Sequence, residues 1–96
     1  MITIVAHMRC MAGTEDQIIA ASAAFIAATR DEPGCIEFYL HQQRDDPSRF
    51  VWYENFTDQV AVDAHVVSQH VADWFGLIGA LGAHNEYALY QRLEVE

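Results

Sequence analysis

Alternating and helical hydrophobic patterns follow one another in a definite order along this 96-residue chain. Residues 2–10 alternate between apolar and more polar side chains, which is typical of a strand with one buried face. The next segment repeats apolar side chains at helical spacing. Thr14 and Gln17 predict a capping box at the start of this helix, and the Pro33-Gly34 pair predicts its end.

The second half of the chain repeats this alternation of strand and helix. Two β-rich runs, residues 35–43 and 49–56, are separated by five polar turn-formers and predict a hairpin. Large side chains occur on both parities of the second run, which is typical of a strand buried on both faces. The Thr57-Asp58 pair and Ser68 can each cap a short helix, and residues 86–95 alternate again as a last strand.

The resulting order, β-α-β-β-α-β, predicts a single α+β domain over residues 1–96. Right-handed crossovers place the helices on one face of an antiparallel sheet, which is the ferredoxin-like sandwich. The other face then carries Val5, Tyr39 or its neighbours, and Tyr87 or Tyr90. Because an open apolar sheet face is a liability for a monomer, we expect a second copy to cover it and form a homodimer.

Charge and composition exclude several classes of partner. The formal net charge is −9, and the five basic residues are all arginines that stand singly, so nucleic acid and anionic membranes are not expected partners. We find no signal-peptide pattern at the N-terminus and no apolar run of the roughly 18 residues that a membrane span requires. Cys10 and Cys35 lack metal-ligand spacing. A reduced cytoplasmic chain is expected, with one disulfide as the alternative.

Three short motifs occur in a distinctive order, and together they cover roughly residues 32–75. They are Glu32-Pro33-Gly34-Cys35, Phe50-Val51-Trp52-Tyr53-Glu54 and Ala64-His65 followed by Ser68 and His70. This ordered set resembles the antibiotic biosynthesis monooxygenase family, whose members are small ferredoxin-like proteins that dimerise into a shared α/β barrel. The resemblance implies a cofactor-free monooxygenase that oxidises a small quinol or polyphenol with O₂.

Other functions remain open within this resemblance. The family also contains isomerases, proteins without a known substrate and haem-degrading enzymes. An isomerase or lyase of a small hydroxy-ketone and a non-catalytic ligand-binding dimer are the main alternatives. The haem-degrading branch uses an Asn on the first strand, and residues 1–10 contain none.

Three residues are candidates for catalysis: His65, His70 and Glu54. Imidazole is the side chain best suited to accept a phenolic proton near neutral pH. Glu54 alternates with aromatic residues on its strand, so its carboxylate must be hydrogen-bonded, paired or protonated. The structural alternatives are a packing role for the histidines at a helix junction and an ion pair of Glu54 with Arg9 or Arg92.

Five aromatic side chains are candidates for the walls of a flat pocket, although stripes of this kind also form ordinary core. They are Trp52, Trp74, Phe38, Tyr53 and Phe75. Trp74 follows His70 by four residues, so the two share one helix face.

We expect no metal site and no cofactor. His65 and His70 are five residues apart, which on one continuous helix would turn their rings roughly 140° from each other. No glycine-rich phosphate loop follows a strand.

Overall fold

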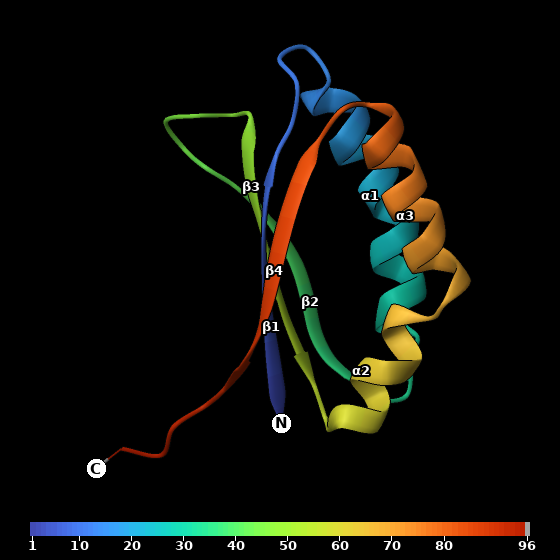
Figure 1. Cartoon of the computed structure of the whole chain (residues 1–96), viewed down its shortest axis with the longest axis vertical. Helices are drawn as coiled ribbons and strands as arrows, with labels where there is room; N and C mark the ends of the chain where they lie inside the picture. Colours follow the sequence, from blue (N-terminus) through green and yellow to red (C-terminus); the bar gives the residue numbers. More distant parts are fainter. Residues whose placement is uncertain (96) are drawn as a thin grey trace.

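A computed structural model describes residues 1–95 of the chain. The elements follow in the order β1 (Ile2–Arg9), α1 (Glu15–Arg30), β2 (Cys35–Gln42), β3 (Arg49–Phe56), α2 (Gln59–Val66), α3 (Gln69–Ala80) and β4 (His84–Gln91) (Figure 1). This is the predicted β-α-β-β-α-β order, with α2 and α3 together forming the second crossover. None of the helices within residues 1–95 is long and apolar enough to cross a membrane.

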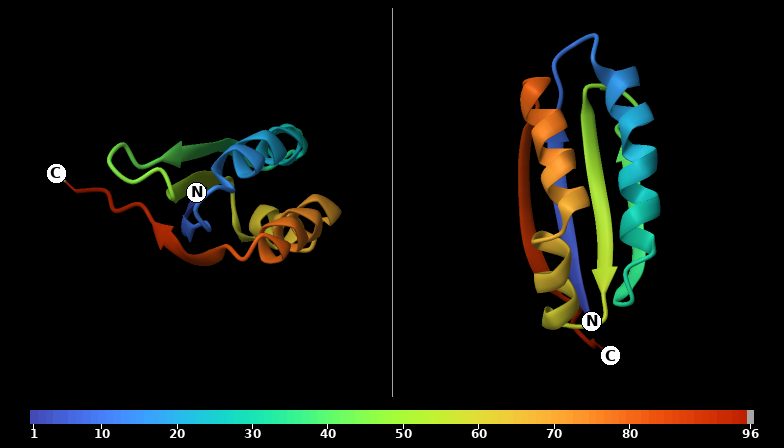
Figure 2. Two further views of the ribbon diagram at one scale, coloured as in Figure 1. Left: turned by 90° about the horizontal axis from the view of Figure 1, so that it is seen from above. Right: turned by 90° about the vertical axis from the view of Figure 1, so that its right-hand side faces the viewer.

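The four strands form one sheet in the order β2-β3-β1-β4. All neighbouring strands pair antiparallel, so β1 and β2, like β3 and β4, run parallel without being neighbours. The three helices lie together on one face of the sheet, with α1 beside α3 (Figure 2). The predicted α+β, ferredoxin-like architecture is therefore confirmed.

The start of α1 differs from the prediction. Thr14 is the N-cap residue, but its side chain makes no capping hydrogen bond, so the predicted capping box with Gln17 is wrong. The Thr14 hydroxyl instead donates to the carbonyl of Met11 at 2.6 Å, and Glu15 accepts from the backbone N–H of Gly13 at 2.9 Å. Because Gly13 has a φ of +91°, the chain turns sharply into the helix, and side-chain bonds within the turn replace the box.

The last strand is displaced from its predicted range of residues 86–95. It begins at His84, opposite Arg9, and ends at Gln91, opposite Ile2. The physical reason is that β1 begins at Ile2, so no β1 residue remains to pair with the chain after Gln91. The alternating pattern of the sequence continues beyond the point where a pairing partner exists.

The helix face of the sheet carries the hydrophobic core. The cross-strand register places Ile4, Ala6 and Met8 of β1 on this face, as their alternation predicted, and each is at most 5% exposed. Aromatic rings from the sheet and from α1 and α3 fill the layer between them; Phe38 and Phe56 are completely buried. This aromatic layer surrounds the candidate site.

The opposite face of the sheet has no covering layer within residues 1–95 (Figure 1). Val5, Tyr53 and Tyr39 lie side by side in its centre because they pair across β1, β3 and β2. The sequence left open whether Tyr87 or Tyr90 lies on this face. Tyr90 pairs with Thr3 and lies on the open face, whereas Tyr87 pairs with Ala6 and lies on the helix face. Tyr39 and Tyr90 are 48% and 53% exposed, so this face presents large aromatic side chains.

Candidate active site

A pocket of about 260 Å³ opens between the helix face of the sheet and the junction of α2 with α3. Its wall is mostly apolar, with a few polar groups, which is the usual composition of a small-molecule site. The lining residues with aromatic or ionisable side chains are Phe25, Trp52, Glu54, His65, Trp74, Phe75 and Tyr87.

Five of the eight residues singled out from the sequence line this pocket: Trp52, Trp74, Phe75, Glu54 and His65. They come from β3, α2 and α3, so the fold gathers them from three elements. The aromatic candidates and the ionisable candidates therefore line the same pocket. Their roles in binding and catalysis remain predictions.

The other three residues lie elsewhere. Phe38 is completely buried behind the pocket wall, with its ring stacked on that of Trp52 at 4.7 Å between centroids. Tyr53 lies on the opposite face of the sheet, beside Val5 and away from the pocket. His70 lies outside the lining, at the first turn of α3, where it contacts Glu32.

Glu32 is the residue that the sequence reasoning missed. Its signal was present in the Glu32-Pro33-Gly34 motif, but we assigned the motif to the turn after α1 and gave Glu32 no chemical role. The turn that contains Gly34 packs closely against α2, because a Cβ atom on Gly34 would collide with the side chain of Ala61. A glycine is required there because no larger residue allows this approach. The close contact brings Glu32 to the end of α2.

A break between α2 and α3 brings the two histidines together. The Asp58 side chain caps α2 by accepting from the N–H of Ala61 at 2.9 Å. Ser68 caps α3, and its hydroxyl also donates to the carbonyl of His65 at 2.6 Å. Both caps were predicted and are confirmed. Because the chain turns at Ser68, His65 and His70 do not share one helix, and their ring centroids lie 6.0 Å apart.

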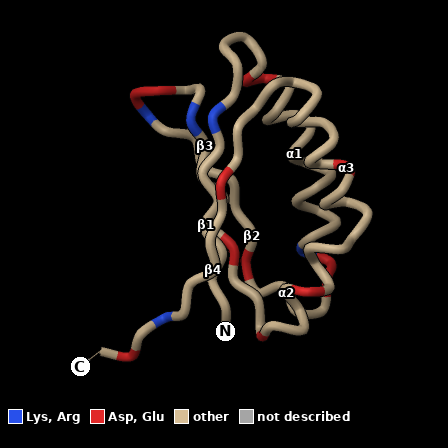
Figure 3. Tube along the Cα trace, viewed as in Figure 1, with Lys and Arg blue, Asp and Glu red and all other residues tan. Residues whose placement is uncertain are grey.

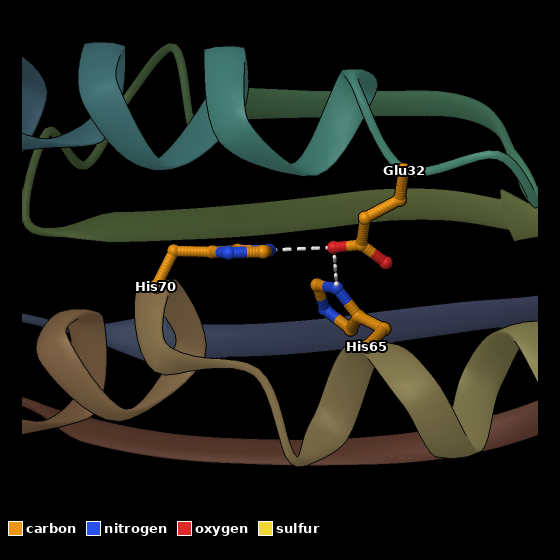
Figure 4. A group of neighbouring side chains, drawn as sticks. All are labelled: Glu32, His65 and His70. Atoms are coloured by element: carbon orange, nitrogen blue, oxygen red, sulfur yellow. Dashed lines mark hydrogen bonds and ion pairs between the residues drawn. The ribbon is translucent and has the colours of Figure 1, made fainter.

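Glu32, His65 and His70 form a hydrogen-bonded cluster (Figure 4). One oxygen of Glu32, Oε2, lies 2.8 Å from Nδ1 of His65 and 2.5 Å from Nε2 of His70. In the neutral tautomer that donates Nδ1–H to Glu32, His65 keeps its lone pair on Nε2. That nitrogen lies 3.7 Å from the Glu54 carboxyl group, the other ionisable group of the pocket. The ionisable neighbour of Glu54 is therefore His65, and not Arg9 or Arg92, the ion-pair partners considered from the sequence.

Burial shifts the protonation of both pocket groups. Desolvation lowers the pKa of His65, against the opposing effect of the Glu32 carboxylate, so the imidazole is neutral near pH 7. Desolvation and the nearby charge of Glu32 raise the pKa of Glu54 to about 8, so this group is a carboxylic acid at neutral pH. A neutral base and a protonated acid therefore lie side by side in the pocket.

Cysteine chemistry is not favoured near the site. Cys35 and Cys10 are both free, and Cys10 is buried. Burial and the charges of Glu32 and Glu54 raise the pKa of the Cys35 thiol to about 11. The thiolate, which is the nucleophilic form, is therefore scarce at neutral pH.

Two polar atoms in the pocket lack a partner within the described chain. The indole N–H of Trp52 and the side-chain oxygen of Asn85 are buried without a hydrogen bond, and both residues line the pocket. Buried polar groups are nearly always hydrogen-bonded. One unused donor and one unused acceptor therefore belong to residues of the pocket wall.

Comparison with known proteins gives relatives along nearly the whole chain. A solved structure from Shewanella oneidensis is 33% identical, with a TM-score of 0.81 over 93% of this chain and 89% of that one. A Pseudomonas aeruginosa structure is 26% identical, with a TM-score of 0.88 over 97% of this chain and 94% of that one. A structure described as an antibiotic biosynthesis monooxygenase shares the fold, with a TM-score of 0.90, 24% identity and coverage of 98% and 100%.

A curated relative matches a shorter part of the chain. An uncharacterized protein of Synechocystis sp. is 27% identical over 64 residues, which is 67% of this chain and 44% of that protein. The chain thus spans less than half the length of this relative. The sequence profile described as "Antibiotic biosynthesis monooxygenase" matches residues 1–77 and so includes β1, the Glu32 turn and both histidines. The chain belongs to the antibiotic biosynthesis monooxygenase family.

Proposed function

We propose that this protein is a cofactor-independent monooxygenase that oxidises a small quinol or polyphenol with O₂. The observation that carries the proposal is the position of His65. Its Nδ1 lies 2.8 Å from Glu32, its Nε2 lies 3.7 Å from Glu54, and both His65 and Glu54 line the mostly apolar pocket. Membership in the family supports oxygenation as the reaction class.

The reaction needs no external reductant, because the substrate supplies the electrons. A quinol reacts with O₂ to give a hydroxyquinone and water: one oxygen atom enters the ring and the other is reduced to water. The four electrons that reduce O₂ all come from the quinol. Deprotonation of the quinol starts this transfer, because the resulting anion is far more electron-rich than the neutral phenol.

Each pocket residue has a separate role in this proposed reaction. His65 takes the phenolic proton on Nε2, and the Glu32 carboxylate stabilises the imidazolium through Nδ1. The free indole N–H of Trp52 donates to the phenolate oxygen. Glu54, protonated below about pH 8, can return a proton to the reduced oxygen. The aromatic wall keeps the anion and the oxygen intermediates away from bulk water.

Oxygen uptake by the purified protein tests this assignment. We expect a panel of benzene- and naphthalene-quinols to contain substrates whose oxidation outpaces the buffer rate and loses at least 100-fold in His65→Ala, the size of a general-base contribution. His84→Ala is the matched control, because the His84 side chain is 74% exposed and lies outside this pocket. Uptake equal to buffer, or unchanged in His65→Ala, would sink the proposal.

A second candidate function is proton transfer at carbon in a small hydroxy-ketone, as in an isomerase or lyase. The observation that favours it is the same acid and base pair, Glu54 and His65, 3.7 Å apart in one pocket. Solvent deuterium incorporated into such ketones without O₂ consumption would select this function. Thermal stabilisation by aromatic ligands with neither reaction would indicate a non-catalytic binding protein.

The proposal includes a homodimer formed through the open face of the sheet. Tyr39 and Tyr90 are about half exposed on this face, and the half-buried Tyr53 and Val5 lie on β3 and β1, the two strands between theirs. A second sheet packed against this surface would bury large aromatic area that the single chain leaves in water.

A further inference from the structure

We propose that Glu32, His65 and His70 form a binding site for one divalent first-row transition-metal ion. One carboxylate oxygen and two imidazole nitrogens, from the turn after α1, the end of α2 and the start of α3, lie within 4.8 Å of one another (Figure 4). Imidazole suits Zn²⁺, Co²⁺, Ni²⁺ and Cu²⁺, and two histidines with one carboxylate are a common set for these ions. The expectation of no metal site considered one continuous helix, and the break at Ser68 removes that premise.

The distances are close to those that a metal requires. Ligand atoms about 2.0–2.2 Å from a tetrahedral Zn²⁺ lie about 3.3–3.5 Å from one another. The oxygen of Glu32 is now 2.8 Å and 2.5 Å from the two nitrogens, so an ion must widen each gap by under about 1 Å. Glu32 and His70 can make this adjustment, because their side chains are 17% and 24% exposed while that of His65 is 6% exposed. The same exposure gives the ion a route from solvent.

The carboxyl group of Glu54 lies on the other side of the His65 ring. Glu54 is 8% exposed in its side chain, forms no hydrogen bond within the described residues, and lies 3.7 Å from His65 Nε2. When Nδ1 of a histidine binds a metal, its proton resides on Nε2 and is usually donated to a carboxylate or carbonyl. A protonated carboxyl group keeps its carbonyl oxygen as an acceptor, and Glu54 lies 3.7 Å from Nε2, so both edges of His65 face suitable groups.

The charge around the cluster also favours a cation. Acidic positions gather around α2 and the end of α1, while the arginines of β1 and β3 lie at the opposite end of the sheet (Figure 3). The nearby Arg30 is engaged with the carbonyl of Phe38 at 2.9 Å. Within residues 1–95, the ion pairs of Glu32 are those with the two histidines. A dication would therefore add positive charge directly at the Glu32 carboxylate, whose ion-pair partners among these residues are the two histidines.

Metal binding excludes the catalytic state of His65 proposed above. Coordination through Nδ1 leaves the proton on Nε2, the nitrogen that would act as the base toward the pocket. The metal-loaded protein thus lacks its base, and Zn²⁺ is expected to inhibit quinol oxidation at a one-to-one ratio. This consequence rests on the proposed function, whereas the binding site itself does not.

Direct titration with Zn²⁺ tests the site without any substrate. Calorimetry at pH 7.5 should give one ion per chain, and Co²⁺ should give the visible absorption bands of a tetrahedral or five-coordinate nitrogen and oxygen site. His70→Ala and Glu32→Gln should each weaken binding at least tenfold, and Glu54→Gln should weaken it about tenfold. Circular dichroism verifies that each variant is folded, and His70→Ala is the safer one because His70 is partly exposed.

The matched control is His84→Ala, which removes the exposed His84–Glu86 pair and should leave the affinity unchanged. Less than one ion per chain, or equal affinity in wild type and His70→Ala, would overturn the site and leave Glu32 as a group that only orients two histidines. Zn²⁺ binding without quinol oxidation would support the metal site and refute the enzyme assignment. Quinol oxidation without Zn²⁺ binding would support the enzyme assignment and refute the metal site.

Discussion

Replacing Glu54 with Gln removes a buried ionisable group and keeps its shape. In the folded protein, the pKa of Glu54 is raised to about 8 from an ordinary value of 4.5, because burial and Glu32 disfavour the carboxylate. Between these two values the folded chain holds a proton that the unfolded chain releases. The contribution of Glu54 to stability is therefore fully present below pH 4.5 and is lost as the pH rises through 8.

The size of the effect follows from this linkage. Within the window, each pH unit lowers the free energy of unfolding by about 1.4 kcal/mol, or about 2 kcal/mol between pH 6.5 and 8. Gln does not titrate, so the stability of Glu54→Gln relative to wild type should rise by that amount. The lowered pKa of His65 acts with the opposite sign below about pH 6.5, where protonation of the unfolded chain destabilises the fold, so the comparison begins there.

Urea unfolding at pH 6.5, 7.0, 7.5 and 8.0 measures this difference, with the fluorescence of the buried Trp52 and Trp74 as the signal. Protein concentration is held constant because a dimer would make stability depend on it. Glu94→Gln is the control, since Glu94 is exposed and lies beyond β4. The test is the pH dependence of the difference in unfolding free energy, and not its absolute value, because burying the Gln amide has a free-energy cost of its own. A pH-independent difference between Glu54→Gln and wild type would refute the raised pKa.

Three further predictions test the packing around the site and the open sheet face. Gly34→Ala should lower the free energy of unfolding by about 1–3 kcal/mol in urea titrations, because its Cβ would collide with Ala61. Gly76→Ala, where a Cβ meets nothing within 4 Å, should instead raise it by roughly 0.5–1 kcal/mol; equal effects would contradict the close approach. Asn55→Ala should cost about 1–3 kcal/mol by the same measurement, because the buried Asn55 is bonded to Thr3 at 2.5 Å and to Glu37 at 2.7 Å; an unchanged midpoint would count against it. Tyr39→Glu should convert a dimer into a monomer in light scattering, while Val60→Glu on α2, 75% exposed, should not; a dimer in both would place the interface elsewhere.

Local patterns in the sequence were enough to predict most of the architecture. Strand alternation and the Asp58 and Ser68 caps depend on neighbours a few residues away, so the element order, the helix break and the buried face of β1 were all predicted correctly. The end of β4 and the capping box of Thr14 with Gln17 were predicted wrongly, and the choice between Tyr87 and Tyr90 was left open. The end of β4 is set by where β1 begins, and the choice between Tyr87 and Tyr90 is set by the register between these strands.

The candidate site shows the same division. The sequence by itself offered His65, Glu54 and the two tryptophans as candidates, from their residue types in this ordered pattern, and all four line the pocket. Only the tertiary structure joined Glu32 to His65 and His70, across 33 and 38 residues of chain. That contact exists because Gly34 lets the turn approach α2 and because the helices break at Ser68. No periodicity within one element encodes a distance between three elements, so the cluster that we propose binds a metal emerged only when the chain was folded.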